Sequence, residues 1–173
     1  MEEIDSKTVY EGRISSVRVV RFRHADGEES EREIVGHPGA VAIVAHDSEH
    51  IWLVRQPREA VGEEALLEIP AGKLDVPGEA PLACAQRELA EEIGKTARDW
   101  RELKRFHTTP GWADEQMTLF EATGLADTQR DLDPGERIEV VTWPLADLDG
   151  AIAACADAKS LIGLMYLRQR ACT

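Results

Sequence analysis

The sequence predicts a globular α/β protein, and three observations support this class. The chain has 173 residues, a length that suits one domain with a sizeable core. Several segments alternate apolar and polar residues or run continuously apolar, as β-strands do. Residues 81–93 and the region from 157 or 158 onward carry apolar residues at helical spacing instead. Strands and helices are therefore expected to be interspersed along one chain.

The expected strands are short and are separated by turns. Residues 8–14 and 17–22 alternate apolar and polar positions on either side of Ser15 and Ser16. The segment AVAIVA, residues 40–45, is continuously apolar and is expected near the centre of a sheet, in a hairpin with residues 51–56. Further strands are expected at 31–36, 99–110, 117–123 and 138–144, with a charged, turn-rich stretch at 124–137.

The helix expected over residues 81–93 has clear boundary signals. Pro81 suits a first helical turn, because its missing N–H costs nothing there, and Gly94 suits a C-cap. An apolar stripe is formed by Leu82, Ala85, Leu89 and Ile93. The stripe predicts that one side of this helix is buried.

Three carboxylates stand beside that stripe. Glu88, Glu91 and Glu92 project from a common face, because they are three and four positions apart. Such like charges repel by roughly a few tenths of a kcal/mol per pair, and a divalent cation would turn that cost into a binding site. Oxygen ligands suit Mg²⁺, with Mn²⁺ as an alternative. From spacing alone, a solvated acidic face with an Arg87–Glu91 ion pair is an equally open interpretation.

Composition excludes several classes of function. The net charge of −13 argues against a nucleic-acid partner, which needs a basic surface. No apolar run approaches a membrane span, and the acidic N-terminus does not resemble a signal peptide. Cys84, Cys155 and Cys172 lack metal-binding spacing and are expected to be reduced thiols, which favours a cytoplasmic location.

Arg55 and Arg58 are basic residues in an acidic chain, at the end of the 51–56 strand. They are expected either to form surface ion pairs with nearby glutamates or to clamp phosphate oxygens, which guanidinium groups bind bidentately. An acidic chain that acts on a polyphosphate needs such local arginines or a metal ion to bring two negative partners together.

Gly72, Glu79 and the segment RELAEEIG, Arg87–Gly94, resemble the Nudix box, the loop–helix signature of the Nudix hydrolases. From Glu79 to Gly94 the spacing matches the family pattern. Six residues separate Gly72 from Glu79 where the family has five, and Lys95 replaces an apolar residue. The segments LLEIPAG and EREIVGHPGAVAIV further resemble the ADP-ribose pyrophosphatases of this family.

The resemblance implies an α/β/α sandwich around a mixed sheet, with an N-terminal region of antiparallel strands. It divides the chain into residues 1–36, strands that reach across to the partner in a homodimer, and residues 37–173, the Nudix hydrolase domain. It implies Mg²⁺-dependent hydrolysis of ADP-ribose, a small-molecule nucleotide substrate, to AMP and ribose 5-phosphate. GDP-mannose or another nucleotide sugar, FAD and damaged nucleoside triphosphates are alternative substrates. A non-catalytic ADP-ribose sensor is disfavoured, because the box is intact.

The resemblance also implies roles for particular residues. The metal ligands would be the carbonyl of Ala71 and the carboxylates of Glu88, Glu91 and Glu92, which thereby act in catalysis. Glu115, in the loop after Pro110 and Gly111, would be the catalytic base, with Asp114 as its competitor. The substrate-binding residues would be Arg55, Glu68 and, from the partner, Arg32, and Arg58 is added to them as the second guanidinium of the phosphate clamp described above.

Overall fold

The computed structural model describes residues 1–132, 135 and 137–171, and these form two compact units. The first unit comprises residues 1–39 and 106–116, and the second comprises residues 40–105 and the described residues from Met117 onward. The predicted boundary between residues 36 and 37 stays a prediction. Among the described residues, no helix has the length and apolar character needed to cross a membrane.

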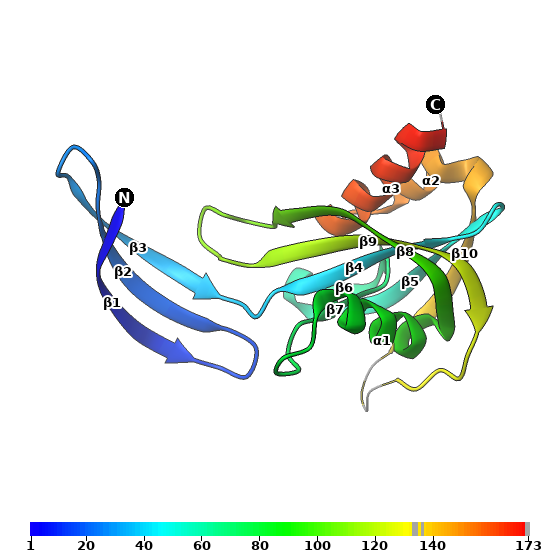
Figure 1. The fold of residues 1–173 in the computed structure, drawn as a ribbon, viewed down its shortest axis with the longest axis horizontal. Helices are drawn as coiled ribbons and strands as arrows, with labels where there is room; N and C mark the ends of the chain where they lie inside the picture. Colours follow the sequence, from blue (N-terminus) through cyan, green and yellow to red (C-terminus); the bar gives the residue numbers. More distant parts are fainter. Residues whose placement is uncertain (133–134, 136, 172–173) are drawn as a thin grey trace. The chain divides into compact units, whose positions relative to one another are not determined.

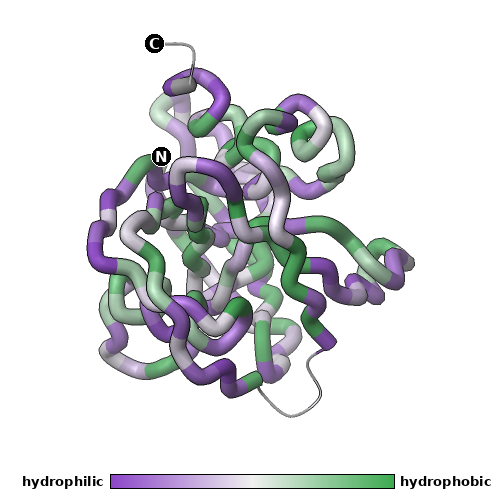
Figure 2. Tube along the Cα trace, turned by 90° about the vertical axis from the view of Figure 1, so that its right-hand side faces the viewer, coloured by the Kyte–Doolittle hydropathy of each residue, from purple (hydrophilic) through white to green (hydrophobic). Residues whose placement is uncertain are grey.

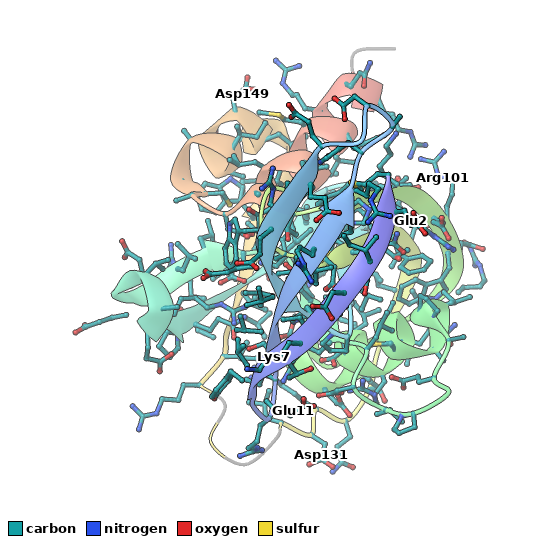
Figure 3. The ribbon with its side chains drawn as sticks, turned by 90° about the vertical axis from the view of Figure 1, so that its left-hand side faces the viewer. Glu2, Lys7, Glu11, Arg101, Asp131 and Asp149 are labelled. Carbon is teal, nitrogen blue, oxygen red and sulfur yellow. The ribbon has the colours of Figure 1, made fainter. Side chains whose placement is uncertain are left out.

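The first unit is built on an antiparallel sheet in which β2 lies between β1 and β3. Their bounds are Glu2–Glu11 for β1, Ser16–Arg23 for β2 and Glu29–Gly36 for β3. The expectation that the first strand begins at residue 8 is wrong, because residues from Glu2 onward already pair with β2, starting at Arg23. Figure 3 shows Glu2, Lys7 and Glu11 along β1, where all three are exposed.

The second unit is built on a mixed sheet, as predicted. Its strands are β4 (Ala40–His46), β5 (His50–Arg58), β6 (Glu63–Glu68), β7 (Ala71–Lys73), β8 (Lys95–His107), β9 (Gln116–Asp127) and β10 (Glu139–Pro144). The main order is β10-β5-β4-β9-β8, while β6 pairs with β5 and β7 pairs with β4. Strand β4 pairs with β9 in parallel and with β5 and β7 in antiparallel orientation, which makes the sheet mixed.

Strand β4 lies at the centre of this sheet. It pairs with β5, β7 and β9, and its residues from Ala40 to Ala45 are all buried. A strand covered on both faces needs apolar side chains on both sides, which explains the continuous run AVAIVA. The predictions of a central strand and of a hairpin with β5 are therefore confirmed.

Helices cover both faces of the sheet, as Figure 1 shows for α1 on one side and for α2 and α3 on the other. Helix α1 spans Pro81–Ile93, α2 spans Leu148–Ala154 and α3 spans Ala158–Ala171, with short 3₁₀ turns η1 at Glu59–Val61 and η2 at Leu145–Asp147. On the α3 face, a Cβ added at Gly163 would lie 2.9 Å from a methyl group of Val44, so the helix packs closely on β4.

The core beneath α1 joins apolar residues from the helix and the sheet. Leu89 and Ile93 of α1 pack in one cluster with Val41 and Ile43 of β4 and Val54 of β5. Hydrophobic and hydrophilic residues alternate over short stretches of the trace in Figure 2, as elements with one buried face require. The predicted stripe is correct except at Leu82, which is exposed, while Cys84 takes a buried position in its place.

The stretch 124–137 is less irregular than the sequence suggested. Strand β9 continues to Asp127, because β8 already begins at Lys95 and runs beside it. The Lys95 Nζ atom lies 2.5 Å from an Asp127 carboxylate oxygen, and the Thr128 N–H donates to the Gly94 carbonyl at 3.0 Å. Residues 133, 134 and 136 of this stretch lie outside the described residues.

Candidate active site

Helix α1 has the boundaries that its end residues require. Pro81 is at the first turn, and Gly94 adopts φ 64°, a left-handed conformation that lets its N–H bond to the Ala90 carbonyl. The carboxylates beside the buried face differ in depth: Glu92 is buried, Glu88 is nearly so and Glu91 is about one-third exposed. The helix therefore holds these three residues at the edge of the core, as predicted.

Arg87 contacts three carboxylates at once. Its Nη1 atom donates to Glu88 at 2.9 Å and to Glu91 at 2.8 Å, which confirms the predicted ion pair with Glu91. Its Nε and Nη2 atoms donate to the two carboxylate oxygens of Glu79, each at 3.0 Å. The Glu79 hydrogen bonds raise the pKa of Arg87, and they lower the pKa of Glu79 below its ordinary value. Glu79 is thereby tied to the helix.

The extra residue before Glu79 is absorbed in a turn. The Glu79 N–H donates to the Val76 carbonyl at 3.1 Å, and Gly78 within this turn adopts φ 80°. Val76 is exposed at the surface. The longer spacing from Gly72 therefore leaves the Glu79–Arg87 contact intact.

Strand β7 brings two further residues to the carboxylates. The Ala71 N–H donates to Glu92 Oε2 at 3.0 Å, which places the backbone of Ala71 beside that carboxylate. Gly72 lies so close to Glu88 that an added Cβ would overlap the Glu88 carboxyl group. Only glycine leaves this space for Glu88, which gives a physical reason for Gly72 in the loop.

The predicted metal ligands can be tested against this arrangement. Within residues 1–132, 135 and 137–171, no group of three His, Cys, Asp or Glu side chains is arranged to hold a metal ion as it stands. Arg87 currently neutralises Glu88 and Glu91. Carboxylate oxygens nevertheless lie where β7 meets α1: the Glu88 carboxyl group occupies the space that Gly72 leaves beside the strand, and Glu92 accepts from the Ala71 N–H. This donor set suits a divalent cation such as Mg²⁺ or Mn²⁺, so the residues fit the implied metal.

A pocket of about 520 Å³ lies at the end of β5, among residues of β5, β6 and the start of β10. It is lined by Arg55, Gln56, Pro57, Glu64, Ala65, Arg137 and Glu139. The Nε2 atom of Gln56 is buried and has no hydrogen-bond partner among the described residues. A buried amide donor without a partner is costly, and Gln56 is one of the residues that line this pocket.

Sequence reasoning found Arg55 in this pocket and missed its other polar residues. Register brings them together: Arg55 pairs with Glu139 on β10, and Gln56 pairs with Leu66 on β6. No local pattern around Arg137 or Glu139 predicts which strand they join, because strand pairing depends on the whole fold. The RQ dipeptide was the available signal for Gln56.

Glu68 is the most deeply buried of the predicted substrate-binding residues, with 1% of its surface exposed. The Arg58 guanidinium donates to both carboxylate oxygens of Glu68, at 2.6 and 2.7 Å. The Lys159 ammonium donates to Glu68 Oε2 at 2.5 Å. The bond to Glu68 raises the pKa of Arg58. Both Glu68 oxygens therefore have protein partners, and its predicted contact with a ribose stays a prediction.

Glu115 and Arg32 belong to the first unit, so their roles stay predictions. Glu115 accepts a 2.5 Å hydrogen bond from the Thr108 hydroxyl and lies 3.5 Å from His37 Nδ1. Its competitor Asp114 accepts from the His37 N–H at 2.8 Å and faces Arg18 at 3.7 Å. Arg32 is exposed on β3, where its guanidinium donates to the Glu31 carbonyl.

Cys84 and Cys155 are buried and free, while Cys172 lies outside the described residues. Burial raises the pKa of Cys84 to about 12 and that of Cys155 to about 11. Thiols with such pKa values are poor nucleophiles near neutral pH. Neither residue is a candidate for covalent catalysis.

Known proteins are similar to this chain in both sequence and structure. The family model described as NUDIX domain matches residues 36–162. The ADP-ribose pyrophosphatase of Bacillus subtilis (strain 168) is 38% identical over 97% of this chain and 95% of that protein. The methanol dehydrogenase activator of Bacillus methanolicus is 36% identical over 95% of this chain and 91% of that protein. A crystal structure of an ADP compounds hydrolase aligns with a TM-score of 0.84 and 26% identity, over 97% of this chain and 92% of that chain. The predicted α/β/α fold is confirmed.

Proposed function

The chain belongs to the NUDIX domain family and is a Nudix hydrolase, and from this premise we propose that it hydrolyses the pyrophosphate bond of ADP-ribose. The products are AMP and ribose 5-phosphate. The observation that carries the proposal is the junction of β7 and α1, where the Glu88 carboxyl group lies against Gly72 and the Glu92 carboxylate accepts from the Ala71 N–H. The similarity to an ADP-ribose pyrophosphatase over nearly the whole chain supports the choice of substrate.

Enzymes of this family generally use divalent metals, and Mg²⁺ is the proposed ion, with Mn²⁺ as a substitute. The residues that would hold it are Glu88, Glu91, Glu92 and the carbonyl of Ala71. Such an ion supplies Lewis-acid chemistry when bound, offsetting negative charge on the pyrophosphate oxygens. Arg87 keeps the acidic side chains from repelling one another before the ion arrives.

The proposed reaction is in-line attack of water on one phosphorus of the pyrophosphate. A new P–O bond forms, the bond from that phosphorus to the bridging oxygen breaks, and the bridging oxygen leaves on the other phosphate. Glu115 is the proposed base that takes the proton of the attacking water. Thr108 and His37 lie beside its carboxylate and orient it.

The pocket at the end of β5 is the proposed site for a phosphorylated ribose of the substrate. Arg55 and Arg137 are donors that suit phosphate oxygens. Glu64 and Glu139 are acceptors that suit ribose hydroxyl groups. Arg58, held in place by Glu68, adds a second guanidinium on the same strand as Arg55.

The remaining proposals concern the assembly and its location. The protein is proposed to be a homodimer in which residues 1–36 reach the partner and Arg32 contacts the partner's substrate. β1 is exposed along nearly its whole length, and Val9 and Tyr10 on it are more than half exposed, which supports an assembly role for this sheet. The buried free thiols of Cys84 and Cys155 support a cytoplasmic location.

The test measures hydrolysis of ADP-ribose in two reactions, one with Mg²⁺ and one with a chelator added. The release of AMP and ribose 5-phosphate is followed in both. The Glu92→Gln variant removes one proposed ligand charge and should lower turnover by about two orders of magnitude or more. Glu49→Gln is the matched control, because Glu49 is exposed in the β4–β5 turn. Metal-dependent release of both products, lost only in the Glu92 variant, is the expected result.

Other outcomes would redirect the proposal. Binding of ADP-ribose without release of products would contradict hydrolysis and favour a sensor. If ADP-ribose neither binds nor reacts, the substrate is wrong, and GDP-mannose, other nucleotide sugars and FAD are the compounds to compare by kcat/KM. Equal turnover with and without chelator would contradict the proposed dependence on a divalent metal ion.

A further inference from the structure

Five polar residues form a hydrogen-bonded cluster at the start of α3, and Glu68, Lys159 and Ser160 among them are buried. The cluster consists of Arg58, Glu68, Asp157, Lys159 and Ser160. Lys159 and Ser160 are 7% and 0% exposed. The Lys159 ammonium donates to Glu68 at 2.5 Å and to Asp157 at 2.8 Å. We refer to these residues as the α3 cluster.

Stability alone does not account for the α3 cluster. Desolvating charged groups costs several kcal/mol per ion by order of magnitude, and apolar residues of similar volume are often equally stable or better. Burial tends to raise the pKa of Asp157, but the charge of Lys159 and hydrogen bonds from Lys159 and Ser160 lower it overall. The Asp157 carboxylate therefore stays ionised. The chain holds a charged network at a position where apolar side chains would stabilise the fold equally well.

The network continues into the segment that leads to the proposed metal site. The Ser160 hydroxyl donates to Asp157 and accepts a 2.8 Å hydrogen bond from the N–H of Ile69. Lys159 donates a hydrogen bond to the side chain of Glu68, the residue that precedes Ile69. The first two residues of the segment 68–71 are thus fixed from α3.

The other end of this segment is fixed from the sheet and from α1. The Pro70 carbonyl accepts from the Ile43 N–H on β4 at 2.8 Å. The Ala71 N–H donates to Glu92 at 3.0 Å. Four consecutive residues are therefore held by three different elements, and the last of them carries the carbonyl proposed as a metal ligand.

We propose that Lys159 and Ser160 are positioning residues for the metal site: they fix residues 68–71 so that Ala71 and Glu92 meet in the arrangement that binds a divalent cation. This inference rests on the proposed function, because it assumes that Ala71 and Glu92 hold the metal. Residues that orient metal ligands typically change affinity by about 10- to 100-fold when they are altered. The α3 helix thereby contributes to the site without touching substrate.

The test measures Mn²⁺ binding to the substrate-free protein, by titration with electron paramagnetic resonance of the free ion. Lys159→Met removes the charge at similar length, and Ser160→Ala removes one hydroxyl. Each should weaken Mn²⁺ binding by about tenfold or more. Lys104→Met and Ser48→Ala, both at exposed positions, are the matched controls and should bind as the wild type does.

Circular dichroism and thermal unfolding separate positioning from loss of the fold. If Lys159→Met does not fold, Ser160→Ala decides the matter, because it removes far less. Folded variants with Mn²⁺ affinity within twofold of the wild type would overturn the proposal. So would weakened binding in the two controls to the same extent.

The same titration keeps this inference distinct from the proposed function. A wild type that binds Mn²⁺ but does not hydrolyse ADP-ribose would overturn the substrate assignment, while weaker binding in the two variants would still support positioning. A wild type that hydrolyses ADP-ribose, with variants of unchanged metal affinity, would overturn positioning alone. At saturating metal, Ser160→Ala should keep a substrate KM near that of the wild type, since the hydrogen bonds of the Ser160 hydroxyl go to Asp157 and to the Ile69 N–H.

Discussion

Arg87 shows how one residue can prepare an acidic site. Its guanidinium bonds to Glu79, Glu88 and Glu91, so its positive charge offsets the mutual repulsion of these carboxylates. A divalent cation would compete with Arg87 for the same oxygens, since both are cationic partners for carboxylates. At the scale of single residues, the balance between these partners sets how readily the site accepts an ion.

Gly72→Ala tests the space beside Glu88. The added methyl group would overlap the Glu88 carboxyl group and force that side chain away from β7. We expect Mn²⁺ affinity and ADP-ribose turnover to fall by about tenfold or more, with little loss of stability because the end of the Glu88 side chain can shift. The measurements are metal titration, steady-state kinetics and denaturant unfolding.

Gly27→Ala is the control for backbone strain. Gly27 has φ 87° in the open β2–β3 turn, so alanine there is strained by about 1 kcal/mol but meets no neighbouring atom. It should lose stability and keep metal affinity. If both glycine variants bind Mn²⁺ equally well, the space beside Glu88 has no role in the site.

Arg137→Gln tests the pocket at the end of β5. Arg137 is proposed to contact the substrate in both the ground state and the transition state, so its removal should raise KM by about tenfold and leave kcat nearly unchanged. Steady-state kinetics with ADP-ribose measure both constants. Arg98→Gln is the matched control, since Arg98 is exposed on β8 and pairs only with its neighbour Asp99 in the described contacts. An unchanged KM in Arg137→Gln would remove this residue from the substrate site.

At the scale of elements, the loop and the helix of the Nudix box are joined by an ion pair that responds to pH. The Arg87 hydrogen bonds lower the pKa of Glu79 from its ordinary value of 4.5. A carboxyl with a depressed folded-state pKa contributes stability that is fully present above its unfolded pKa. That contribution is lost as the pH falls through the lower, folded-state pKa.

Glu79→Gln should therefore change the acid side of the stability profile. Near neutral pH the variant is less stable than the wild type, and the gap closes as the pH falls from above 4.5 through the folded-state pKa of Glu79. Denaturant unfolding across this range gives the free energy of unfolding of both proteins. Glu49→Gln should show a gap that does not vary with pH, and the same behaviour in Glu79→Gln would contradict the proposed linkage.

At the scale of the whole molecule, the proposed homodimer makes a prediction that a monomer cannot satisfy. Light scattering should give twice the chain mass of 19.2 kDa. If Arg32 acts in the partner's site, Arg32→Ala and Glu92→Gln subunits should complement each other after mixing. Half of the randomly mixed dimers are mixed pairs with one intact site, so about a quarter of wild-type activity should return.

The control for mixing is a pair of Glu92→Gln and Glu88→Gln subunits. Both positions lie in α1, so each proposed site takes both residues from one subunit, and every site in every dimer keeps one defect. This pair should stay inactive. Absence of recovery with Arg32→Ala, in a mixture shown to exchange subunits, would place Arg32 outside the partner's site.

Local signals in the sequence predicted several parts of the fold correctly. The limits of α1, the Arg87–Glu91 pair and the central position of β4 all depend on residues within one segment. The first strand was predicted too short, because Glu2–Ser6 is polar and gains its strand conformation only by pairing with β2. The extension of β9 to Asp127 was missed for the same reason, since β8 beside it supplies the partners.

The sequence by itself determined the family pattern, the acidic helix face and the chemistry available to it, because helical spacing and end signals act over a few residues. Only the tertiary structure decided which distant residues meet. Lys159 reaches Glu68 across 91 positions of the chain, and Glu92 meets Ala71 across 21. Such contacts depend on how strands pair and helices pack, and each strand's pattern fits several partners equally well. The α1 residues of the site are therefore predictable from the sequence of one segment, whereas the contributions of β5, β7 and α3 depend on the tertiary structure.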